Sequence, residues 1–262
     1  MVFLLKILVC NDDGIEADGL WALAEELQKV GQVVVMAPHK EQSGVGTAIS
    51  LKRAIRVNKV KSRLAGVEAY SVEGTPADSV IIALRSMFAG EIDLVISGIN
   101  RGSNMGHDVV VSGTLGAAVQ GYLHDIPSMA ISLNGYDGEL HFEPSARMAA
   151  LLATMIRDGM LSERLLLNVN LPNLPLSELK GIEITSQSQQ SYCDAVEHDK
   201  NNDGCYLIKR LPDLGTGLQG YDLWALQQDK ISITPLLDGS TTNLLQDQLQ
   251  ELAPSLLHEM HI

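Results

Sequence analysis

The sequence predicts an α/β fold with a Rossmann-like, mostly parallel sheet and helices on both faces. Apolar runs of strand length alternate with stretches whose apolar residues recur at helical spacing. The runs are apolar almost throughout, as in strands that are covered on both faces. The chain has 262 residues, of which 45% are hydrophobic, so it can bury a substantial core. We expect one domain over 1–262, with a Rossmann-like core at about 1–135 and an arm with C-terminal elements at about 187–262.

The first half contains the clearest strand and helix signals. LLKILVC is a continuous apolar run, and a helical pattern follows it and ends at Gly31. Thr75-Pro76-Ala77-Asp78 combines an N-cap, a first-turn proline and an acidic third position, which indicates a helix start. The expected strands of this half are 4–10, 33–38, 91–97 and 128–131, and the expected helices are 20–30, 76–88 and 112–123.

The second half has weaker signals. We predict a helix at 144–157 and strands at 165–171, 181–185 and 230–234. The polar segment 187–204 is nearly free of core residues, which is typical of a mobile loop or of an arm that packs on a partner subunit. From Thr242 the pattern is helical, and Pro254 is expected to divide this stretch into two pieces.

Charge and composition exclude several classes of partner. The chain has 19 basic and 32 acidic residues and a net charge of -13, which argues against polymeric nucleic acid as a ligand. A small phosphorylated ligand would need a local cation or a ring of backbone amides. No run approaches the roughly 18 apolar residues of a membrane span, and no cleavage site follows the apolar start. We therefore expect a cytoplasmic protein without a membrane partner, in which the scattered Cys10, Cys193 and Cys205 are reduced thiols.

Polar residues follow three of the predicted strands. In an open α/β sheet, ligands bind outside the carboxyl ends of the strands. Asp12 and Asp13 follow the first strand, Ser43 follows the second, and Asn100 follows the strand that ends at Ser97. Adjacent carboxylates repel each other, and a hard divalent ion such as Mg²⁺, Mn²⁺ or Ca²⁺ would neutralise them. The alternative is that one aspartate only forms an Asx turn before Gly14 and caps the next helix.

Glycines and small donors lie in the same predicted region. Gly44 and Gly46 would let backbone amides approach an anion, and Ser112-Gly113-Thr114 places small donors at a helix N-terminus, where phosphate binds well. The alternative is a flexible loop and a simple helix cap. Dinucleotide, P-loop and serine-hydrolase motifs are missing from the positions where they would be needed. His39 and His107 lie beside the expected pocket and could shuttle protons, although the default role of each is structural or solvated.

Taken together, these segments resemble the survival protein SurE family of metal-dependent nucleotidases. The motifs occur in the family's order and cover the N-terminal half and scattered parts of the remainder. They are ILVCNDDGIEADGL, VVMAPHKEQSGVGTAISL, VEGTPADSV, DLVISGINRGSNMGHDVVVSGTLGAAVQG and, more weakly, LNVNLP and ISITPLLDGST. The chain departs from the family between Gln187 and Leu207, where members often carry an Arg-rich stretch and this sequence has no arginine.

The resemblance implies an activity, a cofactor and an assembly. The activity is hydrolysis of nucleoside 5′-monophosphates and sometimes 3′-monophosphates, with short polyphosphate as a further substrate. The cofactor is one divalent ion per subunit, Mg²⁺ or Mn²⁺, in a site that Ca²⁺ can also occupy. The assembly is a homodimer or homotetramer formed through exchanged C-terminal elements. The implied metal ligands are Asp12, Asp13, Ser43 and Asn100, and the implied phosphate donors are Gly44, Asn104, Ser112, Gly113 and Thr114.

The mechanistic hypothesis is hydrolysis by a water molecule that the metal activates. The metal would bind a phosphate oxygen and lower the pKa of the water for in-line attack. Asp12 or Asp13 would accept the proton, and donors at 112–114 would stabilise charge on the equatorial oxygens. Two alternatives remain open: an aspartyl-phosphate intermediate, and a non-enzymatic module that senses nucleotide or metal.

Overall fold

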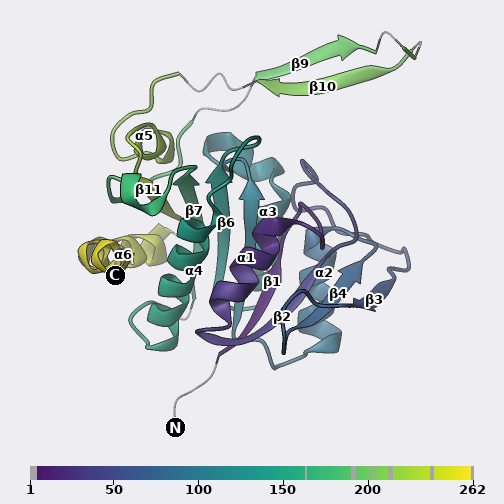
Figure 1. Ribbon diagram of the computed structural model, residues 1–262, viewed down its shortest axis with the longest axis horizontal. Coiled ribbons are helices and arrows are strands. Elements are labelled where there is room, and N and C mark those ends of the chain that lie inside the picture. The colour runs from purple at the N-terminus through teal and green to yellow at the C-terminus, as the bar shows by residue number, and fades with distance from the viewer. Residues whose placement is uncertain are drawn as a thin grey trace.

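The structure is a computed structural model that describes residues 5–162, 164–189, 193–199, 201–202, 204–211, 215–236 and 239–260. One nine-stranded sheet runs through the body, in the order β3-β4-β2-β1-β5-β6-β7-β11-β8, and helices cover both of its faces (Figure 1). The strands are β1 Leu5–Cys10, β2 Gly31–Pro38, β3 Val57–Val60, β4 Glu68–Val72, β5 Leu94–Arg101, β6 Ser128–Asn134, β7 Leu166–Pro172, β8 Ile182–Ile184 and β11 Ile231–Pro235.

The helices form two layers. On one face lie α1 Asp18–Leu27, α4 Phe142–Arg157 and the C-terminal α6 Gly239–Met260, and on the other lie α2 Pro76–Ile82 and α3 Gly113–Leu123. A π-helical turn at Ala83–Met87 extends α2, and α5 covers Asp222–Gln227. Short 3-10 turns lie at Gly106–Val111 and Leu176–Glu178. None of the helices in the described ranges is long and apolar enough to cross a membrane.

The central strands explain why the chain adopts this fold. Neighbouring strands from β4 through β2, β1, β5 and β6 to β7 are all parallel. Their side chains are buried on both faces; in β1, for example, Ile7, Leu8 and Val9 are all inaccessible to solvent. In the described part of this sheet, the antiparallel pairs are β3 with β4 and β11 with β7. The predicted Rossmann-like, mostly parallel α/β fold is confirmed.

The helix α2 begins where the sequence predicts, whereas α1 ends before the predicted position. The Thr75 hydroxyl accepts a hydrogen bond from the Asp78 N–H at 3.1 Å, and the Asp78 carboxylate accepts one from the Thr75 N–H at 2.9 Å, which completes a capping box. The helix α1 ends at Leu27, and Gly31 is already the first residue of β2. A side chain at Gly31 would collide with the backbone of Leu5, so this glycine serves close strand pairing rather than helix closure.

The edge strand β3 and its neighbour β4 had no clear signal in the sequence. Their sequences VNKV and EAYSV are short and contain exposed positions. Because strands at or next to a sheet edge are only partly covered, they lack the continuous apolar run that marks β1 and β2. The pairing of β3 with β4 was therefore missed.

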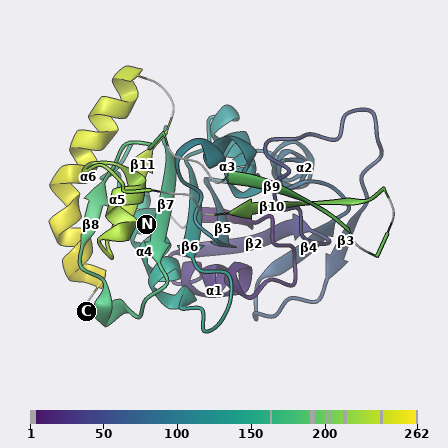
Figure 2. The same cartoon turned by 90° about the horizontal axis from the view of Figure 1, so that it is seen from above.

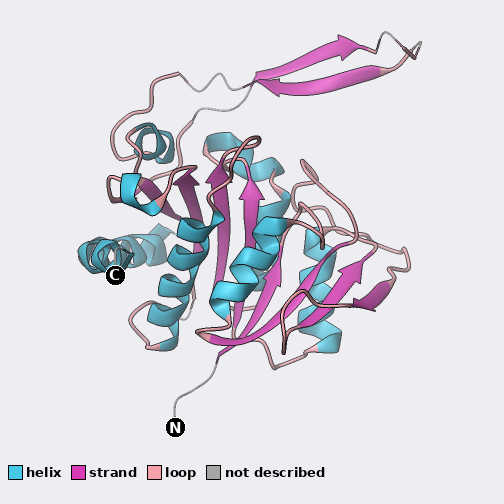
Figure 3. Cartoon of the chain, in the orientation of Figure 1, coloured by secondary structure: helices cyan, strands magenta, loops and turns pink. Residues whose placement is uncertain are grey.

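Part of the expected arm is regular structure. Cys193–His198 and Tyr206–Leu211 pair as the antiparallel hairpin β9–β10, which projects from the body (Figures 1 and 3). Val196 lies opposite Ile208 in the register, and both side chains are exposed. The segment 187–204 is thus in part a hairpin strand rather than a loop; residues 190–192, 200 and 203 of the segment lie outside the described residues.

The C-terminal helix corrects one expectation. The helix α6 passes through Pro254 without a break (Figure 2), so the proline does not divide it. Proline removes one helical hydrogen bond and crowds the preceding turn. Leu245 and Leu249 before the proline and Leu256 and Met260 after it are all buried in the same core. The burial of these side chains on both sides of Pro254 keeps the helix continuous.

Candidate active site

The turn after β1 decides between the two interpretations of the paired aspartates. Asn11 forms the turn: its side chain accepts a hydrogen bond from the Gly14 N–H at 3.1 Å and donates one to the Gly14 carbonyl at 3.1 Å. Gly14 has φ +98, a conformation that favours glycine. Ala17 is the N-cap of α1, without a side-chain cap. Neither Asp12 nor Asp13 therefore serves as the Asx turn or the helix cap.

Asp12 is buried against the start of α3. The Thr114 hydroxyl donates to its Oδ1 at 2.6 Å, and the Thr114 backbone N–H also bonds to this carboxylate. A side chain on Gly113 would place its Cβ 2.8 Å from the Cβ of Asp12, so only glycine allows this approach. Burial raises the pKa of Asp12 to about 6; the Thr114 hydroxyl lowers it in part, and the charge of Asp13 raises it further.

Asp13 is held by Arg101, the last residue of β5. The Arg101 N–H donates to Asp13 Oδ2 at 3.2 Å, and the guanidinium Nη2 lies 3.6 Å from Oδ1. The Asp13 side chain is only 4% exposed. Burial raises its pKa, and the bonds to Arg101 act in the opposite direction. Arg101 was not among the predicted site residues, although it directly follows the predicted ligand Asn100.

Asn100 lies at an irregularity in β5, directly before the Arg101 that contacts Asp13. The pairing of β5 with β6 shifts register between Ser97 and Asn100, and such bulges redirect side chains. The Asn100 amide nitrogen donates to the Gly102 carbonyl at 2.7 Å. Within the ranges that the structure describes, its side-chain oxygen has no hydrogen-bond donor, so this oxygen is available to a ligand.

The loop after β2 lies against the same turn. The Gln42 N–H donates to the Asp12 carbonyl at 2.7 Å, and the Gly46 N–H donates to the Val111 carbonyl at 2.9 Å. These bonds hold the loop between the end of β1 and the start of α3. Ser43 is exposed, and its hydroxyl donates to the Glu41 carboxylate at 2.8 Å rather than to either aspartate. Gly44 is exposed with φ +72.

The predicted phosphate donors have different surroundings. Ser112 is the N-cap of α3, and its hydroxyl accepts from the Leu115 N–H at 3.2 Å. The hydroxyl and N–H of Thr114 are both used by Asp12. Asn104 is buried, and its amide donates to the Ser132 hydroxyl at 2.9 Å. Its backbone carbonyl accepts hydrogen bonds from the side-chain amides of Asn168 and Asn170. Asn104 therefore belongs to a buried amide network.

The two histidines near the site do not contact its carboxylates. His39 is exposed, and its Nδ1 lies 3.4 Å from the Ser71 hydroxyl. His107 is exposed on the 3-10 turn that precedes α3. Of the cysteines, Cys10 and Cys205 are free thiols, and burial raises the pKa of Cys10 to about 12, which keeps it protonated.

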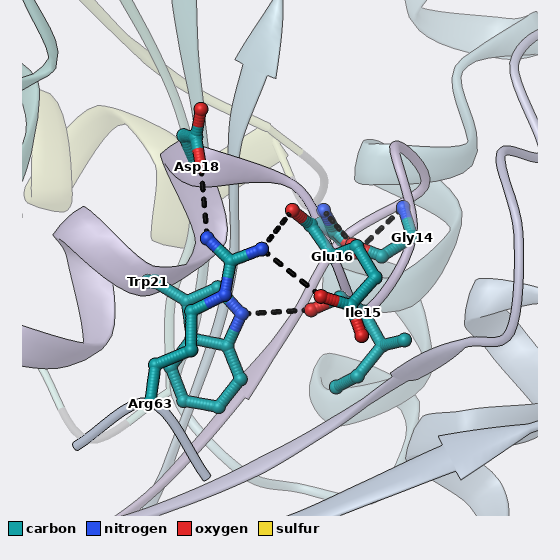
Figure 4. Close-up of polar contacts among 7 residues, drawn as sticks. Gly14, Ile15, Glu16, Asp18, Trp21 and Arg63 are labelled. Carbon is teal, nitrogen blue, oxygen red and sulfur yellow. Dashed lines mark hydrogen bonds and ion pairs between the residues drawn. The ribbon is translucent and has the colours of Figure 1, made fainter. Parts of the chain in front are cut away.

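A distant arginine fixes the chain that leaves the site. Figure 4 shows Arg63, from the segment between β3 and β4, with Glu16 and Asp18 around its guanidinium group. It bonds to the Asp18 carboxylate at 2.8 Å and to the Glu16 carboxylate at 3.0 Å. The indole of Trp21 beneath it donates to the Ile15 carbonyl at 2.7 Å. These contacts hold residues 15–18 directly after the Asp12–Gly14 turn, and no local sequence signal indicates them.

Known proteins are similar to this chain in sequence and fold. The profile of the family described as "Survival protein SurE" matches residues 7–194. The 5′-nucleotidase SurE of Dehalococcoides mccartyi is 40% identical over 234 residues, which cover 88% of each chain. The 5′-nucleotidase SurE of Geobacter sulfurreducens is 39% identical over 236 residues, 88% of this chain and 87% of the relative. The crystal structure of the SurE protein from Aquifex aeolicus has a TM-score of 0.76 at 33% identity and covers 94% of this chain and 99% of that chain. From its sequence, its fold and the match along most of its length, the chain belongs to the survival protein SurE family.

Proposed function

We propose that this chain is a 5′-nucleotidase that hydrolyses nucleoside 5′-monophosphates to nucleoside and phosphate, with one divalent ion, Mg²⁺ or Mn²⁺, as its cofactor. The observation that carries the proposal is the pair of buried carboxylates, Asp12 and Asp13, which serve neither the turn nor the helix cap. Buried carboxylates side by side are costly unless a cation compensates them. The 5′-nucleotidase names of the relatives support the substrate class.

The available donors suit a hard divalent ion. Asp12, Asp13 and the side-chain oxygen of Asn100 would supply oxygen ligands, which Mg²⁺, Mn²⁺ and Ca²⁺ prefer. Ser43 would complete the set when its exposed hydroxyl turns from Glu41, a change between staggered rotamers. A bound ion would offset phosphate charge and lower the pKa of a coordinated water.

The chain's own residues would orient the reacting groups. Thr114 fixes the Asp12 carboxylate, and Arg101 fixes that of Asp13; either carboxylate would accept the proton of the attacking water. The Gly113 N–H, the Ser112 hydroxyl and the Gly44 N–H would donate to the phosphate oxygens, together with the second amide hydrogen of Asn104. Thr114 would act on phosphate only through Asp12. Nucleoside 3′-monophosphates and short polyphosphate are proposed as secondary substrates on the family resemblance.

Substitution of the two aspartates tests this function. Asp12→Asn and Asp13→Asn keep the shape of each side chain and remove its charge, so phosphate release from nucleoside 5′-monophosphates should fall by about 100-fold or more. Asp158→Asn, an exposed aspartate that pairs with Arg157, is the matched control and should keep the parental rate. Folded Asp12 and Asp13 variants that retain the parental rate would show that the proposal is wrong.

We further propose a homodimer or homotetramer formed through the hairpin β9–β10. The hairpin exposes the large apolar side chains Val196, Tyr206, Leu207 and Ile208. An isolated two-stranded hairpin is marginally stable in water, and a second subunit would cover these side chains. The free thiols of Cys10 and Cys205 fit the expected cytoplasmic location, and the net charge of -13 leaves polymeric nucleic acid and anionic membranes outside the proposed partners.

A further inference from the structure

A second cavity lies beside the candidate active site. It has a volume of about 480 Å³ and lies between the end of β2, the end of β4 and the loop that leads to β3. Its volume is in the range of small-molecule sites. The polar side chains that line it are His39, Lys40, Gln42, Arg53, Glu73 and Thr75. Neither the proposed metal ligands nor the proposed phosphate donors are among them.

The cavity and the paired aspartates share one wall. This wall contains Lys40 and Gln42, which line the cavity. Its other side packs on the turn after β1: the Gln42 N–H donates to the Asp12 carbonyl at 2.7 Å. A Cβ on Gly14 would lie only 3.1 Å from the carbonyl carbon of Lys40. A single layer of backbone therefore separates the aspartates from the cavity.

The opposite wall is held in place by a buried carboxylate. Asp78 is 2% exposed, and besides completing the capping box it accepts a hydrogen bond from the Ser50 N–H at 2.8 Å. The Thr75 hydroxyl donates to the Ala48 carbonyl at 2.7 Å. These bonds attach the 48–50 loop to the start of α2. Arg53, three residues further on, donates to the Ser50 hydroxyl at 3.1 Å and to the Glu73 carbonyl at 3.3 Å, which places its guanidinium group at the cavity.

The cations of this cavity are available to an anion. Both acceptors of Arg53 are neutral, and the nearby Glu73 carboxylate pairs with Arg56 at 3.6 Å instead. Within the described part of the chain, no carboxylate lies within 4.0 Å of the charged groups of Lys40 or Arg53. Most basic side chains here do pair with acids, as Lys59 does with Glu68 and Lys230 with Glu183. Two uncompensated cations at one cavity, in a chain with a net charge of -13, indicate a binding site for an anionic group.

We propose that this cavity binds a second phosphate group of the substrate, so that nucleosides with phosphates at two separate positions are the preferred substrates. The orientation of the ligand rests on the proposed function: the phosphate to be cleaved lies at Asp12 and Asp13, and the other bonds to Arg53 and Lys40. Water cleaves only the ester at the aspartates, which releases inorganic phosphate and leaves the second ester on the nucleoside. Guanidinium and ammonium groups are the side chains that bind phosphate most strongly.

Kinetics with matched substrates test the second phosphate site. We would compare a nucleoside 5′-monophosphate with the 3′,5′-bisphosphate of the same nucleoside, using parental protein, Lys40→Gln, Arg53→Gln and the control Lys52→Gln. The control removes the same charge from an exposed residue that does not line the cavity. The parental kcat/KM should be at least about tenfold higher for the bisphosphate, because one charge-assisted contact gives about that gain and two are proposed. In each cavity variant, the advantage of the bisphosphate should disappear, while kcat/KM for the monophosphate should change by less than about threefold. The control Lys52→Gln should keep the advantage.

The outcomes separate this inference from the proposed function. The second phosphate site is wrong, and the nucleotidase function stands, if the monophosphate is hydrolysed but kcat/KM is no higher for the bisphosphate. The same holds if the cavity variants lower kcat/KM equally for both substrates. If neither compound is hydrolysed, the nucleotidase function fails, and calorimetric binding in EDTA then decides on the cavity. Bisphosphate binding about tenfold tighter than monophosphate binding, lost in Arg53→Gln, supports the site; equal affinities overturn it. If inorganic phosphate binds through Arg53 but the bisphosphate binds no tighter than the monophosphate, the cavity is a site for free anions. That result would also overturn the inference.

Discussion

Asp12 is a carboxylate whose protein environment compensates its charge only in part. The Thr114 hydroxyl and N–H bond to it, yet burial still raises its pKa to about 6, against an ordinary value of 3.8. The folded state therefore holds this proton more tightly than the unfolded state between about pH 4 and 6. As pH rises through that window, ionisation of the buried Asp12 lowers the free energy of unfolding. This stability penalty persists at higher pH. A bound cation would remove the penalty.

Asp12→Asn should consequently stabilise the protein in EDTA. At about pH 7.5 we expect the free energy of unfolding to rise by on the order of 1–3 kcal/mol, because the uncharged amide oxygen can still accept the Thr114 hydrogen bond. Urea unfolding measures this change, and the gain should shrink towards about pH 4. Mn²⁺ should raise the melting temperature of the parental protein but not that of the variant. An Asn variant less stable than the parent in EDTA would contradict this account of Asp12.

Thr114 offers a test of positioning that leaves both aspartates intact. Thr114→Val keeps the shape of the side chain and removes the hydroxyl that donates to Asp12 at 2.6 Å. We expect kcat to fall by about 10–100-fold because Asp12 loses its fixed orientation. Thr114→Ser retains the donor and should restore most of the rate. Parental kcat in the valine variant would mean that the hydroxyl does not orient Asp12.

At the scale of elements, the sequence signals that succeeded are local ones. The capping box at Thr75 and Asp78, the small residues at the start of α3 and the continuous apolar runs of β1 and β2 each depend on neighbouring residues. What was missed depends on partners far along the chain. The edge strand β3 and its neighbour β4 lack a continuous apolar run, and the buried side of α6 outweighs Pro254.

The candidate site shows the same contrast between local sequence signals and contacts with distant residues. Strand ends indicated Asp12, Asp13 and Asn100, because the topology of a parallel sheet brings its carboxyl ends together. Arg101 at Asp13 and Arg63 at Glu16 and Asp18 are contacts between residues 45 to 88 positions apart, which residue patterns do not encode. The hydroxyl of Thr114 donates a hydrogen bond to Asp12, a contact that the sequence did not indicate, and its expected role towards phosphate stays a prediction.

Asp222 connects three elements around the site. It is fully buried, and its carboxylate accepts hydrogen bonds from the N–H groups of Gly106 at 3.0 Å, Ser188 at 3.0 Å and Leu223 at 2.7 Å. It thus ties α5 to the 3-10 turn before α3 and to the chain that leads to the hairpin. Asp222→Ala would leave these three buried donors unsatisfied.

We expect Asp222→Ala to lower the free energy of unfolding by about 3 kcal/mol or more, and Asp222→Asn to cost less because an acceptor oxygen remains. Hydrogen exchange should accelerate first in residues 106–111, since they lose their attachment to α5. Asp158→Ala removes an exposed aspartate that pairs with Arg157 and serves as the control. Unchanged exchange at 106–111 in Asp222→Ala would contradict this role.

At the scale of the whole molecule, the hairpin β9–β10 stands apart from an otherwise closed body (Figure 1). Val196 and Ile208 face each other across the hairpin and are 64% and 74% exposed. Polar substitution of both, Val196→Ser with Ile208→Ser, should shift the protein from an oligomer towards monomer, as light scattering after size-exclusion chromatography would show. Leu51→Ser, at an exposed apolar residue elsewhere, should leave the mass unchanged. A parental protein that is already monomeric would contradict the proposed assembly.

The central claim is that Asp12 and Asp13 form a divalent-metal site for phosphate ester hydrolysis. Its most direct test is phosphate release from nucleoside 5′-monophosphates by the parental protein, first after dialysis against EDTA and then with Mg²⁺ or Mn²⁺ restored. We predict that activity is lost in EDTA and returns with the metal, because among the described residues the half-exposed Arg101 is the only basic side chain that pairs with these carboxylates. Full activity in EDTA, or no hydrolysis with any divalent ion, would contradict the claim.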